Sequence, residues 1–485
     1  MLYHSTRDHK STVDSAQAVL NGLAPDGGLY VPQSLPKIDV KACLKEDTFG
    51  MATRIIGALL PDIENMDKLV ERAYRGKFET DELTPTVDTG KFTVLELFRG
   101  PTSAFKDVAL CMLPQLLTAA KTQKGMAEDI LILTATSGDT GKAALCGFQD
   151  VPGIKICVFY PHGGVSAVQR AQMVTQEGGN VAVCAVKGNF DDAQTGVKNI
   201  FAQAVDGKLP AGNKLRLSSA NSINIGRLAP QITYYFKAYA DLLSRGQIAM
   251  GDTVNFCVPT GNFGDILAGW IAKQMGLPVG KLVCASNANN VLTDFIETGV
   301  YDRRRPLHKT DSPSMDILVS SNLERLLYFL SGDTALVAGL MKNLNTEGFY
   351  TVPDSLKKAI TQEFWAGYCD DDKAKQTIKA VFENQNYLCD THTATGWAVA
   401  EDYVNQTGDN RPMVVLSTAS AYKFPAAVLS SLKDTEPMDE FAQMDYLQNL
   451  TGWSVPENLT GLQQKKELHT GVIEKTEMMD FVMGL

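Results

Sequence analysis

The sequence lacks an apolar run long enough to cross a membrane, and its first residues, Met1-Leu-Tyr-His-Ser-Thr-Arg7, lack the apolar core of a secretory signal. It also lacks an extended basic region: the longest cluster is Arg303-Arg304-Arg305, and the formal net charge is -10. A chain with this charge is poorly suited to bind the phosphate backbone of a nucleic acid. We therefore expect a cytoplasmic protein with no membrane or nucleic-acid partner.

Cysteine and histidine are present without the spacings that bind metals. The nine cysteines include no C-x-x-C pair, and the six histidines show no H-E-x-x-H pattern. Several cysteines lie inside apolar runs, such as Ile156-Cys157-Val158 and Phe256-Cys257-Val258. Cysteines in such runs are typically buried, reduced thiols. The sequence therefore predicts neither disulfides nor a metal site.

The chain is longer than one ordinary hydrophobic core requires. Its 485 residues indicate about two to four domains. The first 90 residues are rich in turns, with a short strand pattern at 29–31 and amphipathic helix patterns at 49–60 and 66–75. This part carries no obvious chemistry and predicts a small leading domain or cap.

From residue 91 onward, short apolar strand patterns alternate with longer helical patterns. This alternation is typical of βαβ units and predicts an α/β fold with largely parallel sheets. A helical and charged stretch at about 301–386 interrupts the rhythm, and we interpret it as an insertion or lid. The strands are expected at 92–96, 129–134, 155–160, 181–186, 215–218, 253–258, 281–286 and 413–416.

These patterns give a prediction for the domains. We expect an N-terminal domain at 1–90, a smaller α/β domain at 91–245, a larger α/β domain at 246–430 that carries the helical insertion, and a C-terminal helical segment at 431–485 that packs back on the body.

One stretch places a lysine at the entrance of a helix. The sequence from Glu96 to Asp107 contains a Gly-Pro turn, and Lys106 directly precedes the apolar helical run 108–120. A partly desolvated lysine loses its proton more easily than a surface lysine, so it can attack a carbonyl and form a Schiff base with an aldehyde cofactor. The alternative is a solvated lysine that is merely polar.

A second stretch is suited to bind an anion. Thr260-Gly-Asn-Phe-Gly-Asp265 lies between a predicted strand and a predicted helix. Ligands in α/β sheets bind at such carboxyl ends of strands, and two glycines allow backbone N–H groups to converge on a phosphate at the helix N-terminus. The alternative is a tight turn with a helix cap.

The loop 134–142 is rich in hydroxyl groups and again joins a strand to a helix. It is not a nucleotide P-loop, because Thr136 and Ala143 stand where that motif needs glycine and Ser or Thr. A loop of hydroxyl and N–H groups around the carboxylate or phosphate of a small ligand remains open, and so does an ordinary capped turn.

Three further sites complete the candidates. Asn224 and Arg227 lie three residues apart at a helix start, where the arginine could bind a ligand phosphate or form a surface salt bridge. A hydroxyl in 416–420, at a strand end, could bond the ring nitrogen of a flat cofactor. His392 is interpreted as a structural hydrogen bonder rather than a base. Together these features supply what pyridoxal phosphate requires.

Five motifs, in this order along nearly the whole chain, resemble those of the threonine synthases in their longer bacterial and fungal form. The resemblance implies a pyridoxal-phosphate enzyme of the tryptophan-synthase-β kind, known as fold type II. It also implies conversion of O-phospho-L-homoserine and water to L-threonine and phosphate, by γ-elimination and β-addition of water. The motifs lie at 22–32, 100–107, 136–141, 222–227 and 261–264.

The resemblance also assigns residues. Lys106 would be the Schiff-base lysine and proton shuttle, and Thr418 would face the pyridine nitrogen. Asp139 stands where related enzymes often have an asparagine that contacts the ring oxygen, so it would need a proton or a compensating cation. The cofactor phosphate would be held by Gly261, Asn262, Phe263 and Gly264. The candidates for holding the substrate are Ser103, Ser137, Thr140, Asn224 and Arg227.

Other functions remain open at this point. Another fold type II lyase, such as a serine or threonine dehydratase or a threonine-synthase-like phospholyase, would use the same cofactor. A non-catalytic phospholigand-binding protein is also possible, but binding alone does not need Lys106. The assembly is expected to be a monomer or homodimer.

Overall fold

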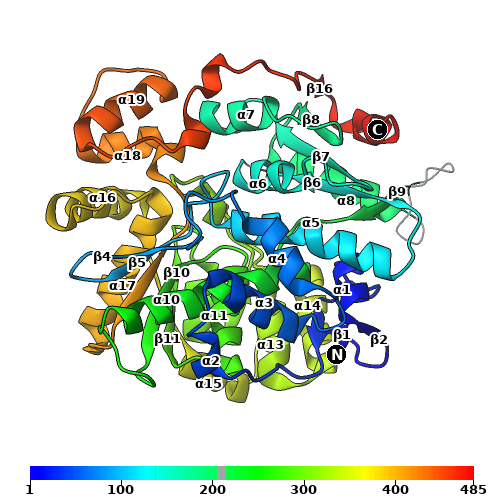
Figure 1. Ribbon diagram of the computed structural model, residues 1–485, viewed down its shortest axis with the longest axis horizontal. Coiled ribbons are helices and arrows are strands. Elements are labelled where there is room, and N and C mark those ends of the chain that lie inside the picture. The colour runs from blue at the N-terminus through cyan, green and yellow to red at the C-terminus, as the bar shows by residue number, and fades with distance from the viewer. Residues whose placement is uncertain (137, 205–208, 210–214) are drawn as a thin grey trace.

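The computed structural model describes residues 1–136, 138–204, 209 and 215–485. Two largely parallel sheets dominate it, and helices cover both (Figure 1). This confirms the predicted α/β class.

The larger sheet has six strands in the order β14-β11-β10-β15-β5-β4. All neighbours are parallel except β4 and β5, which form an antiparallel edge. The strands are β14 (Phe364–Tyr368), β11 (Val279–Ser286), β10 (Val254–Pro259), β15 (Met413–Ser417), β5 (Thr93–Glu96) and β4 (Thr86–Asp88).

The smaller sheet has five strands in the order β16-β8-β7-β6-β9, and all its pairs are parallel. Its edge strand β16 comes from the end of the chain, which passes over the smaller sheet at the top of Figure 1. The strands are β16 (Val472–Ile473), β8 (Val181–Val186), β7 (Ile154–Pro161), β6 (Asp129–Ala135) and β9 (Leu215–Ser218).

Two helix runs position the candidate site. Helix α5 (Lys106–Gln123) packs against α6 (Asp139–Phe148) of the smaller sheet and against α1 (Ser15–Asn21) and α4 (Met66–Tyr74) of the leading segment. Helix α11 (Gly264–Met275) follows β10 and packs against β11. The starts of α5, α6 and α11 each follow a loop that carries candidate residues.

The remaining elements surround these sheets. The leading segment contains β1 (Leu2–Ser5), β2 (Thr12–Asp14), β3 (Tyr30–Pro32), α2 (Val40–Cys43) and α3 (Thr48–Leu59). The body contains α7 (Ala167–Val174), α8 (Phe190–Gln203), α12 (Val291–Thr298), β12 (Val300–Asp302), β13 (Phe349–Thr351), α13 (Leu323–Ser331), α14 (Thr334–Thr346), α15 (Asp354–Glu363), α16 (Asp371–Gln385) and α17 (Thr391–Thr407). Helix α18 (Pro425–Leu432) leads into the C-terminal segment, which contains α19 (Glu440–Thr451) and α20 (Met478–Met483).

The stretch 301–386 is helical as predicted but is not only an insertion. It contains β14, which pairs with β11 and forms one edge of the larger sheet. The prediction missed this strand because five residues, F-W-A-G-Y, lie between two charged amphipathic helices. The strand predicted at 92–96 forms β5, which also lies in the larger sheet. The domain boundaries stay predictions.

The helical stretch that starts after Asn224 is interrupted. The chain forms α9 (Ile225–Leu228), a 3-10 turn at Ala229–Gln231 and α10 (Ile232–Ser244). Pro230 lies in the turn, and because proline has no backbone N–H it cannot continue an α-helical ladder.

The nine cysteines are free; Cys146 is half-buried and the others are buried. The eight buried cysteines confirm the prediction of buried thiols. Within the described part of the chain, no helix is long and apolar enough to cross a membrane.

Candidate active site

Lys106 is the first residue of α5 and only 8% of its side chain surface is exposed. Burial removes water from the ammonium and lowers the pKa of Lys106 to about 8, although Asp139 acts in the opposite direction. The amine lies 4.4 Å from the centre of the Phe105 ring. Among the described residues none accepts a hydrogen bond from this amine, and the role of Lys106 in a Schiff base stays a prediction.

The loop before Lys106 is held by Asp107. Its carboxylate accepts hydrogen bonds from the Thr102 backbone N–H at 2.9 Å and from the Thr102 hydroxyl at 2.5 Å. The Phe105 N–H donates to the Thr418 carbonyl at 2.8 Å. The lysine loop and the end of β15 are therefore adjacent, and the role of Thr418 at the ring nitrogen stays a prediction.

The predicted anion cradle lies between β10 and α11. The Gly261 carbonyl accepts from the Ser320 hydroxyl at 2.7 Å, and the Asn262 carbonyl accepts from the Asn322 N–H at 3.0 Å. No described group accepts from the N–H groups of 261–264. These donors therefore remain for an anion, and the N-terminus of α11 adds its positive dipole.

Close packing explains the residues of the cradle. A Cβ atom at Gly261 would lie 2.7 Å from the Ser314 carbonyl oxygen, so no larger residue fits without a shift. Phe263 has a φ of 62°, and its ring packs 5.5 Å from that of Phe364 on β14. Strand β14, which was not predicted from the sequence, therefore supports the cradle loop 261–264, which was predicted.

The loop before α6 is organised by Thr136. The Thr136 hydroxyl accepts from the N–H groups of Gly138 and Gly141 at 3.0 and 2.9 Å. Gly138 has a φ of 142°, and a Cβ atom there would lie 2.4 Å from the Gln169 side chain. Thr140 lies half-buried in the first turn of α6. Ser137 lies outside the described residues, so its proposed role stays a prediction.

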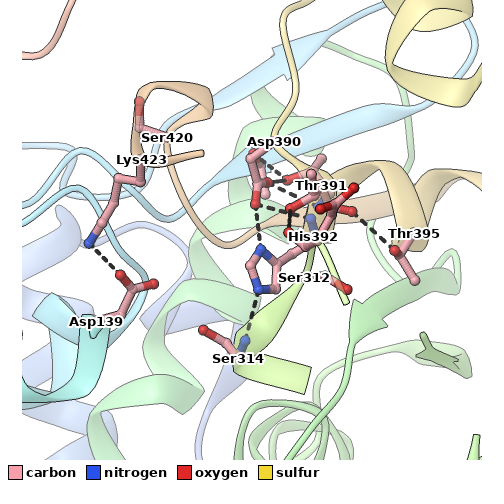
Figure 2. A network of polar contacts seen from close by, with 12 residues as sticks. Asp139, Ser312, Ser314, Asp390, Thr391, His392, Thr395, Ser420 and Lys423 are labelled. Atoms are coloured by element: carbon pink, nitrogen blue, oxygen red, sulfur yellow. Dashed lines mark hydrogen bonds and ion pairs between the residues drawn. The ribbon is translucent and has the colours of Figure 1, made fainter. Parts of the chain in front are cut away.

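Asp139, the first residue of α6, is paired with a cation. Its carboxylate lies 2.7 Å from the Lys423 ammonium (Figure 2). It also accepts a hydrogen bond from the Gln169 amide at 3.1 Å. Burial alone would raise the pKa of Asp139, but Lys423 and Lys106 outweigh it and hold the pKa well below its usual range. The compensating cation that an aspartate needs here is therefore present in the chain.

Arg227 is buried, with 3% of its surface exposed. One of its terminal nitrogens donates to the Ala220 carbonyl, whereas its Nε has no partner among the described residues. Burial lowers its pKa to about 10. Because no described carboxylate pairs with Arg227, the surface salt bridge that the sequence left open is wrong, and the guanidinium remains able to bind an anion.

Asn224 caps the same helix. Its Oδ1 accepts from the Gly226 N–H at 2.9 Å, and its amide donates to the Val19 carbonyl at 2.9 Å. These bonds give Asn224 a structural role in the observed conformation. Contact with a substrate stays a prediction for this residue.

His392 is a hydrogen bonder, as predicted. Its Nδ1 lies 2.7 Å from Asp390 Oδ2, and its Nε2 accepts from the Ser314 backbone N–H at 3.2 Å (Figure 2). A nitrogen that accepts cannot carry the proton, so Nδ1 carries it and donates to Asp390. The ring therefore joins the start of α17 to the segment that contacts Gly261.

Sequence reasoning missed three residues of this region. Lys423 follows β15 and is fully buried. Asn458, in the C-terminal segment, bonds the lysine loop through Ser103 and Gly100. The buried Arg325 donates to the carbonyls of Ser222 and Ile223 and to Asn322, which joins two of the loops. In the sequence, Lys423 lies three residues after the candidate stretch 416–420, which is a weak signal. Asn458 and Arg325 are far from every candidate loop and gave no signal.

Three family profiles match the chain. They are described as Threonine synthase N terminus, which matches residues 2–74, Pyridoxal-phosphate dependent enzyme, which matches 79–419, and Threonine synthase, C-terminal, which matches 393–480.

Individual proteins match over most of the chain. Threonine synthase of Pseudomonas aeruginosa is 40% identical over 437 residues, covering 88% of this chain and 90% of that protein. Human threonine synthase-like 1 is 36% identical over 482 residues, covering 96% of this chain, which spans 63% of the human protein's length. The crystal structure of PLP-bound threonine synthase from Brucella melitensis superimposes with a TM-score of 0.88 and 38% identity, covering 100% of this chain and 99% of that one. These likenesses confirm the predicted fold type.

Proposed function

This chain belongs to the threonine synthase family of pyridoxal-phosphate-dependent enzymes, and we propose on that premise that it converts O-phospho-L-homoserine and water to L-threonine and phosphate. Its cofactor is pyridoxal 5'-phosphate. The observation that carries the proposal is Lys106, a buried amine with a lowered pKa that lies within electrostatic range of Asp265, the residue that follows the cradle.

The residues present fit the cofactor. The N–H groups of 261–264, which have no acceptor among the described residues, would hold its phosphate. Thr418 would offer a neutral hydroxyl to the ring nitrogen, and Asp139 would lie at the ring oxygen. When bound, the cofactor supplies an aldehyde for Lys106 and an electron sink for the reacting carbons.

Lys106 would carry the proton transfers. The reaction leaves a hydroxyl on Cβ and removes phosphate from Cγ, so protons must leave and return at neighbouring carbons. A single amine with a pKa of about 8 can accept and return protons near neutral pH. Because Lys106 is buried, the amine is also shielded from bulk water during these steps.

Arg227 is the strongest candidate for binding the substrate. Its guanidinium is buried, lacks a carboxylate partner among the described residues and lies close enough to Lys106 to lower that pKa. A charged phosphate or carboxylate would satisfy it. Ser103, Ser137, Thr140 and Asn224 are proposed as further contacts.

One experiment separates the candidate reactions. The purified protein loaded with pyridoxal phosphate is incubated with O-phospho-L-homoserine, and phosphate and threonine are measured together. Equal amounts of the two are expected, and Lys106→Ala should yield neither. Phosphate with ammonia and a keto acid would instead identify a threonine-synthase-like phospholyase. If neither threonine nor a keto acid forms, a non-catalytic phospholigand-binding protein is the remaining interpretation.

Cytoplasmic location and assembly as a monomer or homodimer stay predictions. Cell fractionation and light scattering of the purified protein would test them. The proposed reaction does not depend on either outcome.

A further inference from the structure

Asp139 and Lys423 form an ion pair that joins the two sheets. Asp139 begins α6, which covers the smaller sheet, and Lys423 ends the 3-10 turn at Ala421–Lys423 that follows β15 of the larger sheet. Their charged atoms are 2.7 Å apart, and neither side chain is more than 3% exposed. Figure 2 shows the two side chains facing each other. Charged groups as deeply buried as these occur almost only as pairs.

Lys423 also contacts the loop of the reactive lysine. Its ammonium donates to the Thr102 carbonyl at 3.0 Å, four residues before Lys106. Ser420, at the start of the same turn, donates its N–H to the Ser103 carbonyl at 3.2 Å. A single buried cation therefore links the carboxylate of α6 to the backbone that positions Lys106.

One carboxylate oxygen of Asp139 has no partner among the described residues. Oδ1 takes both the Lys423 ion pair and the Gln169 hydrogen bond, and no described residue donates to Oδ2. An ionised carboxylate can only accept hydrogen bonds, whereas a protonated carboxyl can also donate. The charge state of Asp139 thus decides what the site offers to the cofactor's ring oxygen.

We propose that Lys423 is a positioning residue for the cofactor: its ammonium keeps Asp139 ionised and fixed beside Lys106, so that the pair offers an acceptor whose charge is already compensated. This inference rests on pyridoxal phosphate as the cofactor but not on the identity of the substrate. If the protein forms no threonine from O-phospho-L-homoserine, the proposal on Lys423 still stands.

The charges around the two groups give the sign of each effect. Asp139 faces the cations Lys423 and Lys106, and Gln169 is its neutral partner. Lys106 faces Asp139 and Asp107, which raise its pKa, and Lys423 and Arg227, which lower it; Asp265 also lies within electrostatic range. Removing Lys423 should therefore raise the pKa at the Lys106 nitrogen, and neutralising Asp139 should lower it.

The test uses protein loaded with pyridoxal phosphate and no substrate. The visible absorption band of the bound cofactor is titrated with pH in wild type, Lys423→Met, Lys423→Arg and Asp139→Asn. The midpoint should move up by about one pH unit in Lys423→Met, move down in Asp139→Asn and stay within about 0.3 unit of wild type in Lys423→Arg. Lys187→Met, which removes an exposed 2.7 Å pair with Glu474, is the matched control and should not move it.

Cofactor affinity and stability give independent readouts. Lys423→Met should bind pyridoxal phosphate about tenfold more weakly, because the carboxylate of Asp139 then lacks its compensating charge and repels the ring oxygen. Lys423→Met alone should lower the thermal midpoint of unfolding, because it leaves the buried carboxylate unpaired. The same substitution made in the Asp139→Asn protein should raise that midpoint, because it then removes an unpaired buried lysine.

An unchanged titration midpoint in a folded Lys423→Met protein would overturn the proposal. If Lys423→Met does not fold, an unchanged midpoint in Asp139→Asn would overturn it instead. So would a double variant whose thermal midpoint lies below that of Asp139→Asn.

Discussion

The Ser103 hydroxyl donates a 3.0 Å hydrogen bond to Asn458 Oδ1, although 355 positions separate the two residues. The Asn458 amide in turn donates to the Gly100 carbonyl at 3.2 Å. Ser103 has a φ of 57°, a conformation that a residue other than glycine adopts at a cost. The C-terminal segment therefore helps to hold the loop before Lys106 in a strained conformation.

Asn458→Ala is expected to loosen this loop. It leaves the Ser103 hydroxyl and the Gly100 carbonyl without a partner, at a cost of about 1–3 kcal/mol. The thermal midpoint should fall, and the loaded protein should lose its cofactor faster on dilution. Ser103→Gly is the informative comparison, because glycine tolerates this φ while removing the hydroxyl. A stable Asn458→Ala protein with unchanged cofactor retention would show that the contact is dispensable.

The lowered pKa of Lys106 predicts how cofactor uptake depends on pH. Only the neutral amine attacks the aldehyde, so the rate at which cofactor-free protein takes up pyridoxal phosphate should rise with pH around a midpoint near 8. A solvated lysine would give a midpoint near 10.5. Stopped-flow absorbance measures this rate directly, and a midpoint above about 10 would contradict the buried environment of the amine.

Lys106 should also affect stability, and the sign follows from linkage. In the cofactor-free folded chain its pKa lies below that of the unfolded chain, so the unfolded state binds more protons between about pH 8 and 10.5. The contribution of Lys106 to the free energy of unfolding therefore increases with pH over this window. Lys106→Met should lose this dependence and be more stable than wild type at pH 7, as thermal unfolding of cofactor-free protein would show.

The cradle glycine can be tested against another glycine of the chain. Gly261→Ala would place a Cβ atom 2.7 Å from the Ser314 carbonyl oxygen, so the loop must shift and its N–H groups lose their geometry. Cofactor affinity should fall at least tenfold. Gly339→Ala, within α14, meets nothing within 4 Å and should raise stability by up to about 1 kcal/mol without changing that affinity. Equal effects of the two substitutions would argue against the cradle.

Local chemistry made much of this site predictable. The strand and helix alternation, the Lys106 helix start and the Gly261 to Gly264 loop are each encoded within about ten neighbouring residues, and the structure has elements at those places. A hydrophobic period or a glycine pair requires no knowledge of distant residues.

The partners across the site could not be predicted in the same way. The need of Asp139 for a cation followed from its carboxylate, but the identity of Lys423 depends on how two separate sheets pack. Asn458 reaches the lysine loop from the far end of the chain, and β14 is too short to stand out between charged helices. Such contacts are set by tertiary packing, which overrides local patterns.

Arg227 gives a test of the proposed substrate site. If its guanidinium binds the phosphate or carboxylate of the substrate, Arg227→Met should raise KM by about tenfold or more while the visible spectrum of the bound cofactor stays unchanged. Arg227→Lys should recover part of the loss, because lysine keeps the charge but not the planar fork. An unchanged KM in Arg227→Met would show that another group binds the substrate anion.

Asp265 follows the cradle and provides a prediction on acid stability. Burial raises its pKa to about 6, and the hydroxyls of Tyr234 and Tyr235, which donate to its Oδ1, only partly oppose this shift. Its Oδ2 is buried without a partner among the described residues. The folded chain therefore holds a proton that the unfolded chain releases between about pH 4 and 6, so the contribution of Asp265 to stability falls as pH rises through this window.

Asp265→Asn should remove that dependence. The asparagine oxygen can still accept from both tyrosines, and no charge is buried, so the variant should be more stable than wild type at pH 7.5 by up to about 3 kcal/mol. At pH 4 the two should unfold at nearly the same temperature, because wild-type Asp265 is then protonated when folded. Thermal unfolding of cofactor-free protein across this range measures the difference, and a gap that is equally large at both pH values would show that the amide acts through packing rather than through charge.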